Sequence, residues 1–183
     1  MAEYYLVSQL PSLDGISENT PLPITEERLL ELCGRFLGEN AFEEIKNLTL
    51  VPSLCFEKSS SSLIEAWNNG ERDLRLALGK ARAEKLGKSF DLQNRNLPQE
   101  LLKIANTAVD IENPLDAENF LLQFRLNFLE MLRPMDSFSE DYIFYYALKL
   151  KLIMRIRQFD KELGESTYKD IYDSILNEDR LEV

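Results

Sequence analysis

The chain has no histidine, only two cysteines, and no long run of apolar residues. Without histidine it lacks the commonest general base near neutral pH, the Ser-His and Cys-His dyads, and most catalytic zinc sites. Cys33 and Cys55 form no recognisable disulfide or metal-binding pattern, and we expect both to pack as small hydrophobic residues. No stretch approaches the roughly 18 to 20 apolar residues of a membrane-spanning helix. These absences predict a protein that is not an enzyme, needs no metal or cofactor, takes no small-molecule substrate and does not insert into a membrane.

Basic residues are scarce relative to acidic ones. The chain contains 32 Asp and Glu against 21 Lys and Arg, a net charge of −11. This balance argues against binding to nucleic acid or to an anionic membrane surface, because both reward clustered positive charge. The N-terminus also lacks the basic and apolar regions of a signal peptide, so we expect a cytoplasmic protein.

What the chain does contain is helical patterning over most of its length. Residues 4–7 have strand-like composition but no partner strand, so we expect an extended or short helical lead-in. Residues 11–24 are rich in Pro, Gly, Ser and Asn, which is typical of a loop. The expected helices span about 25–37, 40–46, 61–86, 98–109, 113–132, 137–163 and 167–177.

The fold class that follows is all-α, an irregular bundle of about six to seven helices. We expect a single domain over residues 1–183, in which an N-terminal subregion, 1–58, packs on a helical body, 61–177.

The clearest helix start is at Asn113, a good N-cap, with Pro114 at the first helical position. Apolar residues then follow two faces of this helix, and a helix that is apolar on two faces is usually enclosed by others. We therefore expect it to be the centre of the domain. One face carries Phe120, Phe124, Phe128 and Met131, and the other Leu115, Leu122, Leu126 and Leu129.

Three other local signals bear on helix boundaries. Asn40 followed by Glu43, and Ser137 followed by Glu140, have the spacing of capping boxes and predict helix starts. The sequence 68–70, Asn-Asn-Gly, predicts a kink or break within the helix 61–86.

Two motifs resemble ligand sites but are better explained by helix ends. Gly87-Lys88-Ser89 lacks the earlier glycine of a phosphate-binding loop, since Arg82 occupies that position. A calcium-binding loop starting at Asp110 would need glycine at Leu115. Capping of the neighbouring helices accounts for both sets of residues.

An aromatic cluster, Tyr142, Phe144, Tyr145 and Tyr146, lies early in the helix 137–163. Such clusters usually belong to a core with one hydroxyl reaching water, although a role in stacking on a ligand stays open.

One feature, a basic segment, has a functional interpretation as plausible as its structural one. Residues 71–103 carry eight bases and five acids, whereas 1–70 and 104–183 each have a net charge of −7. This segment is either a solvated helix face or a docking surface for an acidic partner, because complementary charge steers association. The candidate partner-binding residues are Arg72, Arg75, Lys80, Arg82, Lys85 and Lys88.

Three stretches together resemble a small bacterial family encoded among the subunits of V/A-type ATPases. They are the opening Tyr4–Pro11, the basic helix Glu71–Gly87, and the pair formed by Asn113–Glu118 and Tyr146–Leu150. That family is distantly similar to the C-type (also called d-type) component of rotary ATPases, an all-helical protein that couples the central rotor shaft to the membrane ring. The present chain is roughly half the length of a full C-type component. The resemblance implies no catalytic residues.

The leading hypothesis is therefore a non-catalytic accessory or stalk-coupling subunit of a bacterial V/A-type ATPase that translocates protons or sodium ions. Its partners would be other subunits of the central stalk or membrane ring, which would hold it at the inner membrane. A stand-alone helical adaptor that binds a partner helix in a groove is the alternative. A carboxylate-based enzyme is a third hypothesis, and it would need a deep pocket around a strongly perturbed carboxylate.

Overall fold

A computed structural model describes residues 2–16, 21–52, 59–92, 95–158, 167–169 and 171–172. These residues form helices and loops and contain no strand, which confirms the all-α prediction. Short helical stretches also occur at 167–169 and 171–172. The longer helices are α1 (Ala2–Gln9), α2 (Glu26–Phe36), α3 (Glu39–Lys46), α4 (Ser62–Lys85), α5 (Gln99–Asp110), α6 (Pro114–Met131) and α7 (Glu140–Arg157).

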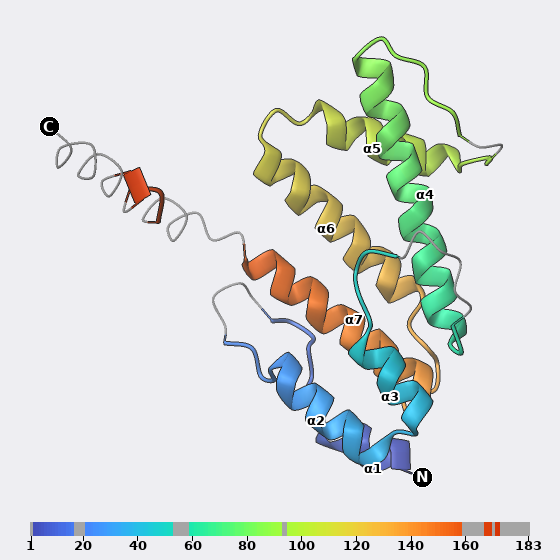
Figure 1. The fold of residues 1–183 in the computed structure, drawn as a ribbon, viewed down its shortest axis with the longest axis vertical. Helices are drawn as coiled ribbons and strands as arrows, with labels where there is room; N and C mark the ends of the chain where they lie inside the picture. The colour runs from blue at the N-terminus through green and yellow to red at the C-terminus, as the bar shows by residue number, and fades with distance from the viewer. Residues whose placement is uncertain are drawn as a thin grey trace, which may run out of the picture.

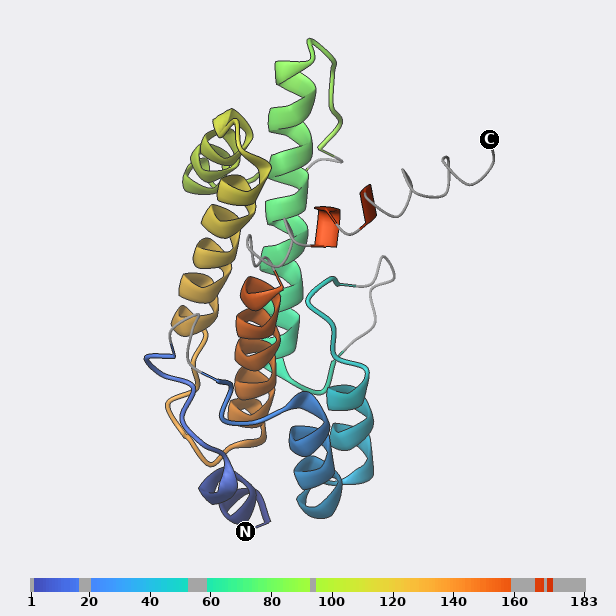
Figure 2. The ribbon, with the colours of Figure 1, turned by 90° about the vertical axis from the view of Figure 1, so that its left-hand side faces the viewer.

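The helices form two packing units, and the long helix α4 and the helix α6 contribute to both (Figures 1 and 2). In the first unit, α1, α2 and α3 pack around α7 together with the N-terminal half of α4, and we call its buried cluster the α7 core. It includes Leu32, Ile45, Trp67, Phe144 and Leu148. In the second unit, α5 packs against the C-terminal half of α4 and against α6, and we call its cluster the α5 core. It includes Leu74, Ala77, Ala81, Ala105 and Leu121.

Small residues make the α5 core compact. Ala77 and Ala105 are fully buried, and alanines on both helices allow the backbones of α4 and α5 to approach closely. The following helix, α6, starts as the sequence predicts: Asn113 is the N-cap, its side chain accepts a hydrogen bond from the Leu115 N–H, and Pro114 is the first helical residue. This cap fixes where the chain turns from α5 into α6.

The centre of the molecule is α7, so the prediction that the Asn113 helix is central was wrong. Every residue from Ile143 to Leu150 is buried, whereas Met131 of α6 is exposed. The apolar residues of α6 face α5, α7 and, at Phe128, α4, but its remaining surface faces solvent. In α7 the polar tips of Tyr145, Tyr146 and Lys149 find partners, so nearly the whole helix can be enclosed.

Several helix ends differ from the sequence prediction by a few residues. The N-cap of α3 is Gly38 and not Asn40, and the N-cap of α7 is Ser139 and not Ser137. In α7 the Ser139 hydroxyl accepts a hydrogen bond from the Tyr142 N–H, which is the contact expected of a cap. The lead-in at residues 4–7 is part of the short helix α1. The predicted end of the helix 137–163 and most of the helix 167–177 lie outside the described residues.

The predicted break at residues 68–70 does not occur, because α4 is continuous. Gly70 instead allows an aromatic ring of α6 to pack closely against α4. A Cβ atom at this position would lie 2.4 Å from two ring atoms of Phe128, whose ring also packs against Trp67 with centroids 6.0 Å apart. Glycine inside a helix costs about 1 kcal/mol relative to alanine. The close approach of the Phe128 ring accounts for its presence here.

We expect Gly70→Ala to destabilise the fold by about 1–2 kcal/mol, since the overlap with Phe128 outweighs the gain in helix propensity. Urea unfolding followed by circular dichroism measures the change. In a double-mutant cycle with Phe128→Leu, the alanine should become neutral or stabilising, because the ring that it meets is gone. Equal destabilisation in the presence and absence of the ring would contradict this explanation.

Candidate functional site

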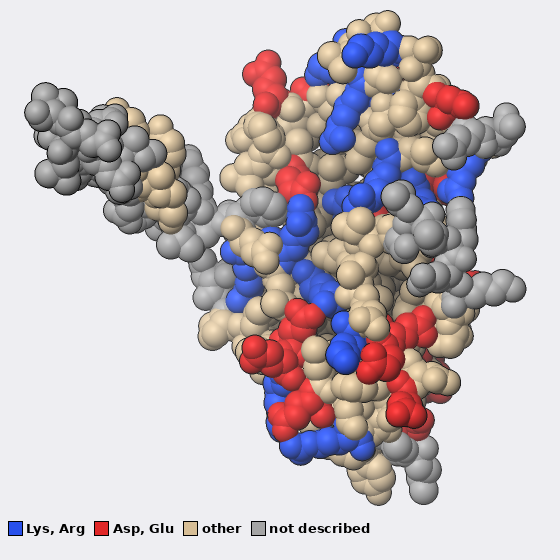
Figure 3. Space-filling model, viewed as in Figure 1, with Lys and Arg blue, Asp and Glu red and all other residues tan. Residues whose placement is uncertain are grey.

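The predicted basic residues of α4 do not form one surface. Arg75 and Arg82 lie on the same face of the helix as Glu71, at spacings of four and eleven residues. Lys80 lies on another face, where its Nζ is 3.7 Å from Glu84 Oε1. Figure 3 shows Lys and Arg over the middle and upper part of one side of the molecule, and acidic side chains with basic ones among them lower down over α2 and α3.

The other three predicted residues have local roles. Lys85 donates a 2.7 Å hydrogen bond to the carbonyl oxygen of Val109, so it stabilises the C-terminal end of α5. Arg72 donates to the side chain of Asn69 within α4. Lys88 follows the end of α4 in an exposed loop. The structure thus brings together Arg75 and Arg82, and leaves Arg72, Lys80, Lys85 and Lys88 outside their cavity.

Arg75 and Arg82 line a cavity of about 250 Å³ that we call the arginine cavity. It lies where α4, α6 and α7 meet the loop after α3. Its charged lining residues are Glu71, Arg75, Arg82, Glu118, Arg125 and Arg155. Four guanidinium groups and two carboxylates give this lining a net charge of +2, on a chain whose net charge is −11.

The inner wall of the arginine cavity is a buried ion pair. The side chain of Glu71 is 3% exposed and that of Arg125 is 12% exposed. Arg125 donates from Nε and Nη2 to the two oxygens of Glu71, both at 2.9 Å, which is the bidentate geometry that the guanidinium favours. Arg75 adds a third hydrogen bond, from Nε to Glu71 Oε1 at 3.1 Å. Each carboxylate oxygen of Glu71 therefore accepts at least one hydrogen bond from a guanidinium group.

Three further arginines line the outer part of the cavity, and two of them, Arg75 and Arg82, keep guanidinium N–H groups without a partner among the described residues. Arg155 of α7 donates from Nε and Nη2 to one oxygen of Glu118, at 2.9 and 2.8 Å. Arg75 is about half exposed, and its contact with Glu71 engages only Nε. Within the part of the chain that the structure describes, the side chain of Arg82 has no hydrogen bond or ion pair. The cavity therefore offers donors that Glu71 and Glu118 do not occupy.

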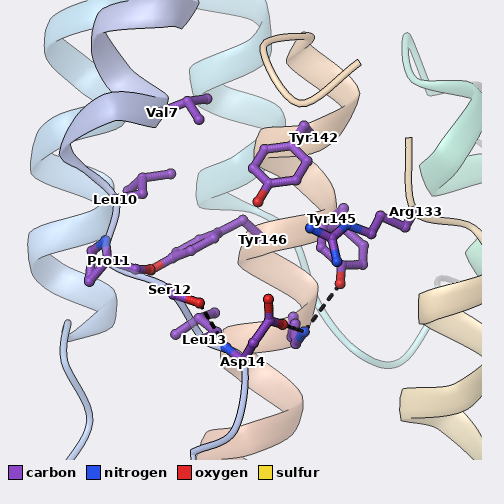
Figure 4. Close-up of a pocket in the computed structure, with 11 residues that line it drawn as sticks. Val7, Leu10, Pro11, Ser12, Leu13, Asp14, Arg133, Tyr142, Tyr145 and Tyr146 are labelled. Atoms are coloured by element: carbon purple, nitrogen blue, oxygen red, sulfur yellow. Dashed lines mark hydrogen bonds and ion pairs between the residues drawn. The ribbon is translucent and has the colours of Figure 1, made fainter. Parts of the chain in front are cut away.

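A second cavity, of about 270 Å³, lies between α1, the loop at residues 10–14 and α7 (Figure 4). We call it the tyrosine cavity, because Tyr142, Tyr145 and Tyr146 form its wall on α7. The hydroxyl of Tyr146 donates to the carbonyl oxygen of Pro11 at 2.8 Å, and that of Tyr145 donates to Glu130 at 2.7 Å. Phe144, the fourth member of the predicted aromatic cluster, is fully buried in the α7 core.

Lys149 is the central charge of the tyrosine cavity. Its Nζ lies 2.5 Å from Asp14, 2.6 Å from Glu130 and 3.2 Å from the Tyr145 hydroxyl. Burial works against the charged ammonium, but these hydrogen bonds prevail and raise the pKa of Lys149 above its ordinary value. All three donors of the ammonium are in use. The cluster fastens the 10–14 loop to α7, and it leaves no donor for a ligand.

The same contacts shift the neighbouring groups. The hydrogen bond from Lys149 lowers the pKa of Asp14. Burial opposes ionisation of Glu130, yet the hydrogen bonds from Lys149 and Tyr145 lower its pKa as well. Burial and the hydrogen bond to Glu130 raise the pKa of Tyr145 to about 12. The charged groups of the tyrosine cavity bind one another and join two parts of the fold. The arginine cavity is therefore the better candidate for a functional site.

Sequence reasoning missed Arg125 and Arg155, because the basic segment 71–103 contains neither. Arg125 and Glu71 are 54 residues apart in the chain. A signal was present: Arg125 lies between Phe124 and Leu126 on a helix with an apolar face, and an arginine there needs a carboxylate partner when it is enclosed. The sequence does not say which carboxylate this is.

No group of three or more His, Cys, Asp or Glu side chains in the described ranges is placed to hold a metal ion. None of the described helices is both long enough and apolar enough to cross a lipid bilayer. Cys33 is buried and unpaired, and burial raises the pKa of its thiol to about 11. Cys55 lies outside the described residues.

Comparison with known protein families gives a match over the C-terminal part of the chain. A family model described as "Protein of unknown function (DUF2764)" matches residues 83–179, a stretch that begins near the end of α4 and includes α5, α6 and α7. No curated protein and no solved structure matches the chain.

Proposed function

The chain belongs to the DUF2764 family, whose model covers 97 of its 183 residues, and we propose that it is a non-catalytic accessory or stalk-coupling subunit of a bacterial V/A-type ATPase. In this role it is a cytoplasmic protein held at the inner membrane by other subunits of the complex. The proposal starts from the resemblance of three stretches of the sequence to a family encoded among ATPase subunits. It is independent of the DUF2764 match, because that family has no assigned function.

The observation that carries the proposal is the arginine cavity. Arg75 and Arg82 are exposed at its edge, and the charge of its lining is opposite to that of the chain as a whole. A local positive surface on an acidic protein favours one orientation of an acidic partner, since complementary charge fixes the register of an interface. The proposed partner surface is an acidic segment of a central-stalk or membrane-ring subunit.

The helical architecture supports the same role. A coupling subunit needs stiff elements that carry a contact surface, and α4 is a continuous helix of 24 residues with the arginine cavity near its middle. Two of the stretches that carry the resemblance lie on central helices: most of Glu71–Gly87 lies on α4, which contributes to both packing units, and Tyr146–Leu150 lies on the buried part of α7.

The proposal is tested by a pull-down of the tagged protein from its own host. We expect ATPase subunits in the wild-type eluate and a loss of most of them with Arg75→Glu/Arg82→Glu, because the reversed charges repel an acidic partner. Arg72→Glu/Lys80→Glu is the matched control: it makes the same change in net charge on the same helix but outside the cavity. Circular dichroism of both variants verifies the fold.

Recovery of the wild-type protein without any ATPase subunit would count heavily against the proposal. Equal loss of subunits with both double variants would instead assign the effect to net charge and would remove the arginine cavity from the interface.

A stand-alone adaptor is the second candidate, and one observation favours it. A largely apolar cavity of about 290 Å³ lies between α4, α5 and α6, with Leu101, Ile104, Phe124, Phe128 and Met131 in its lining. A groove of this kind suits the apolar face of a partner helix. The same pull-down separates the two functions, because an adaptor is recovered with a partner that is not an ATPase subunit.

A further inference from the structure

The arginine cavity has the composition of a binding site for a small oxyanion, and we propose that it binds a phosphoryl group, from free phosphate or from an organic phosphate monoester. The inference concerns arginines of the proposed docking surface but does not depend on the ATPase assignment. It follows from the donors that remain available, the charge of the lining and the apolar part of the wall.

The first argument is the supply of donors. The side chain of Arg82 has no hydrogen-bond or ion-pair partner among the described residues, and the two Nη groups of Arg75 are not engaged by Glu71. Both arginines lie on one stripe of α4, because a separation of seven residues returns to the same face of a helix. A guanidinium offers paired N–H groups whose geometry matches phosphate oxygens. Two such groups on one wall can hold one oxyanion from adjacent positions.

The second argument is preorganisation. Arg75 is held through its Nε by Glu71, and Glu71 in turn accepts hydrogen bonds from Nε and Nη2 of Arg125. The orientation of the exposed guanidinium is therefore set by a buried ion pair. A side chain that is ordered before binding loses less conformational entropy on binding, which strengthens the complex.

The third argument is charge, which favours a phosphoryl group over a carboxylate. The charged residues of the lining sum to +2. A phosphate monoester carries about −1.5 to −2 near neutral pH, whereas a carboxylate carries only one negative charge. The phosphoryl group neutralises the lining more completely.

The uncharged part of the wall indicates what the rest of the ligand can be. Leu50, Val51, Leu78 and Leu121 line the same cavity. Apolar residues beside the arginines can cover an apolar substituent on the phosphate, at roughly 25 cal/mol for each Å² removed from water. An organic phosphate with an aromatic or aliphatic group should therefore bind more tightly than phosphate alone.

Isothermal titration calorimetry of the purified full chain at low ionic strength tests the inference, with phenyl phosphate, inorganic phosphate and benzoate as ligands. We expect phenyl phosphate to bind one site per chain with a Kd below about 1 mM. Benzoate should bind at least about tenfold more weakly, because it has a single negative charge and two oxygens. Inorganic phosphate that binds as tightly as phenyl phosphate would also support the site, and would identify the free ion as its ligand.

Two variants locate the binding. Arg82→Gln should weaken phenyl phosphate binding at least about tenfold without a change in thermal unfolding, because this exposed side chain has no hydrogen bond or ion pair among the described residues. Lys80→Gln, which removes the same charge from another face of α4, should leave the Kd unchanged. Equal weakening by both variants, no saturable binding, or equal binding of benzoate would each overturn the inference. None of these results bears on the pull-down, which measures assembly.

Discussion

Replacing Glu71 with Gln should destabilise the protein by about 3 kcal/mol, because it leaves the guanidinium of Arg125 enclosed without a negative partner. The side chain of Glu71 is 3% exposed and accepts two hydrogen bonds from Arg125 and one from Arg75. A neutral amide can accept only some of these hydrogen bonds and supplies no charge. For a chain of this length, we expect the midpoint of thermal unfolding to fall by roughly 6–12 °C.

The control for Glu71 is the removal of both partners. Glu71→Gln/Arg125→Met no longer encloses a positive charge, so it should recover most of the lost stability. Arg75→Gln should cost little alone, since Arg75 is about half exposed and water replaces its contact. If the double variant is as unstable as Glu71→Gln, then Glu71 acts through packing, and the buried-charge explanation is wrong.

Removing the negative partners of Lys149 should have the second-largest effect. Asp14→Asn/Glu130→Gln leaves an ammonium that is 10% exposed without a carboxylate, and we expect a loss of about 2–3 kcal/mol in urea unfolding. Both carboxylates are themselves partly exposed, so Lys149→Met alone should cost less: the remaining acids can be hydrated. The triple variant, with all three changes, should recover much of the stability of the wild type.

The Lys149 cluster also predicts how stability depends on pH. Asp14 and Glu130 have pKa values below their ordinary values of 3.8 and 4.5 in the fold. Their contribution is therefore present above those values and is lost as the pH falls through the lower pKa values of the folded protein. The triple variant should lose less stability than the wild type on acidification below pH 4.5, because it lacks both acids.

At alkaline pH the dependence of stability on pH has the opposite sign. The folded protein holds protons on Lys149 and Tyr145 more tightly than the unfolded chain, whose ordinary values are 10.5 and 10.0. This contribution is complete below pH 10 and decreases as the pH rises toward the folded pKa of about 12 for Tyr145. The midpoints of urea unfolding, measured from pH 3 to pH 11, test both the acidic and the alkaline part of this dependence. A wild-type profile that parallels that of the triple variant throughout the acid range would contradict the proposed role of Asp14 and Glu130.

Much of the fold follows from local sequence signals. Helix periodicity placed most helices correctly to within a few residues, and the N-cap Asn113 was identified at its correct position, because capping depends on residues within one turn. These local signals could not predict which helix is the most deeply buried. Both α6 and α7 have apolar residues around most of their circumference, and only tertiary contacts decide that α7 is enclosed on all sides.

The candidate site was less accessible to sequence reasoning than the fold. The basic segment identified Arg75 and Arg82 because their charge stands out in a local window. Charge density says nothing about which helix face each residue occupies after packing, so Lys80 was grouped with them. Arg125 and Arg155 come from α6 and α7, and their approach to Arg75 depends on the angles at which the helices cross.

The arginine cavity spans the boundary between the two packing units. Leu50 packs against the α7 core, whereas Leu78 and Leu121 belong to the α5 core, and all three line the cavity. A ligand or partner bound there contacts both units at once. The free energy of that binding therefore also opposes their separation, and occupancy of one small site is thermodynamically linked to how firmly the two halves of the molecule are joined.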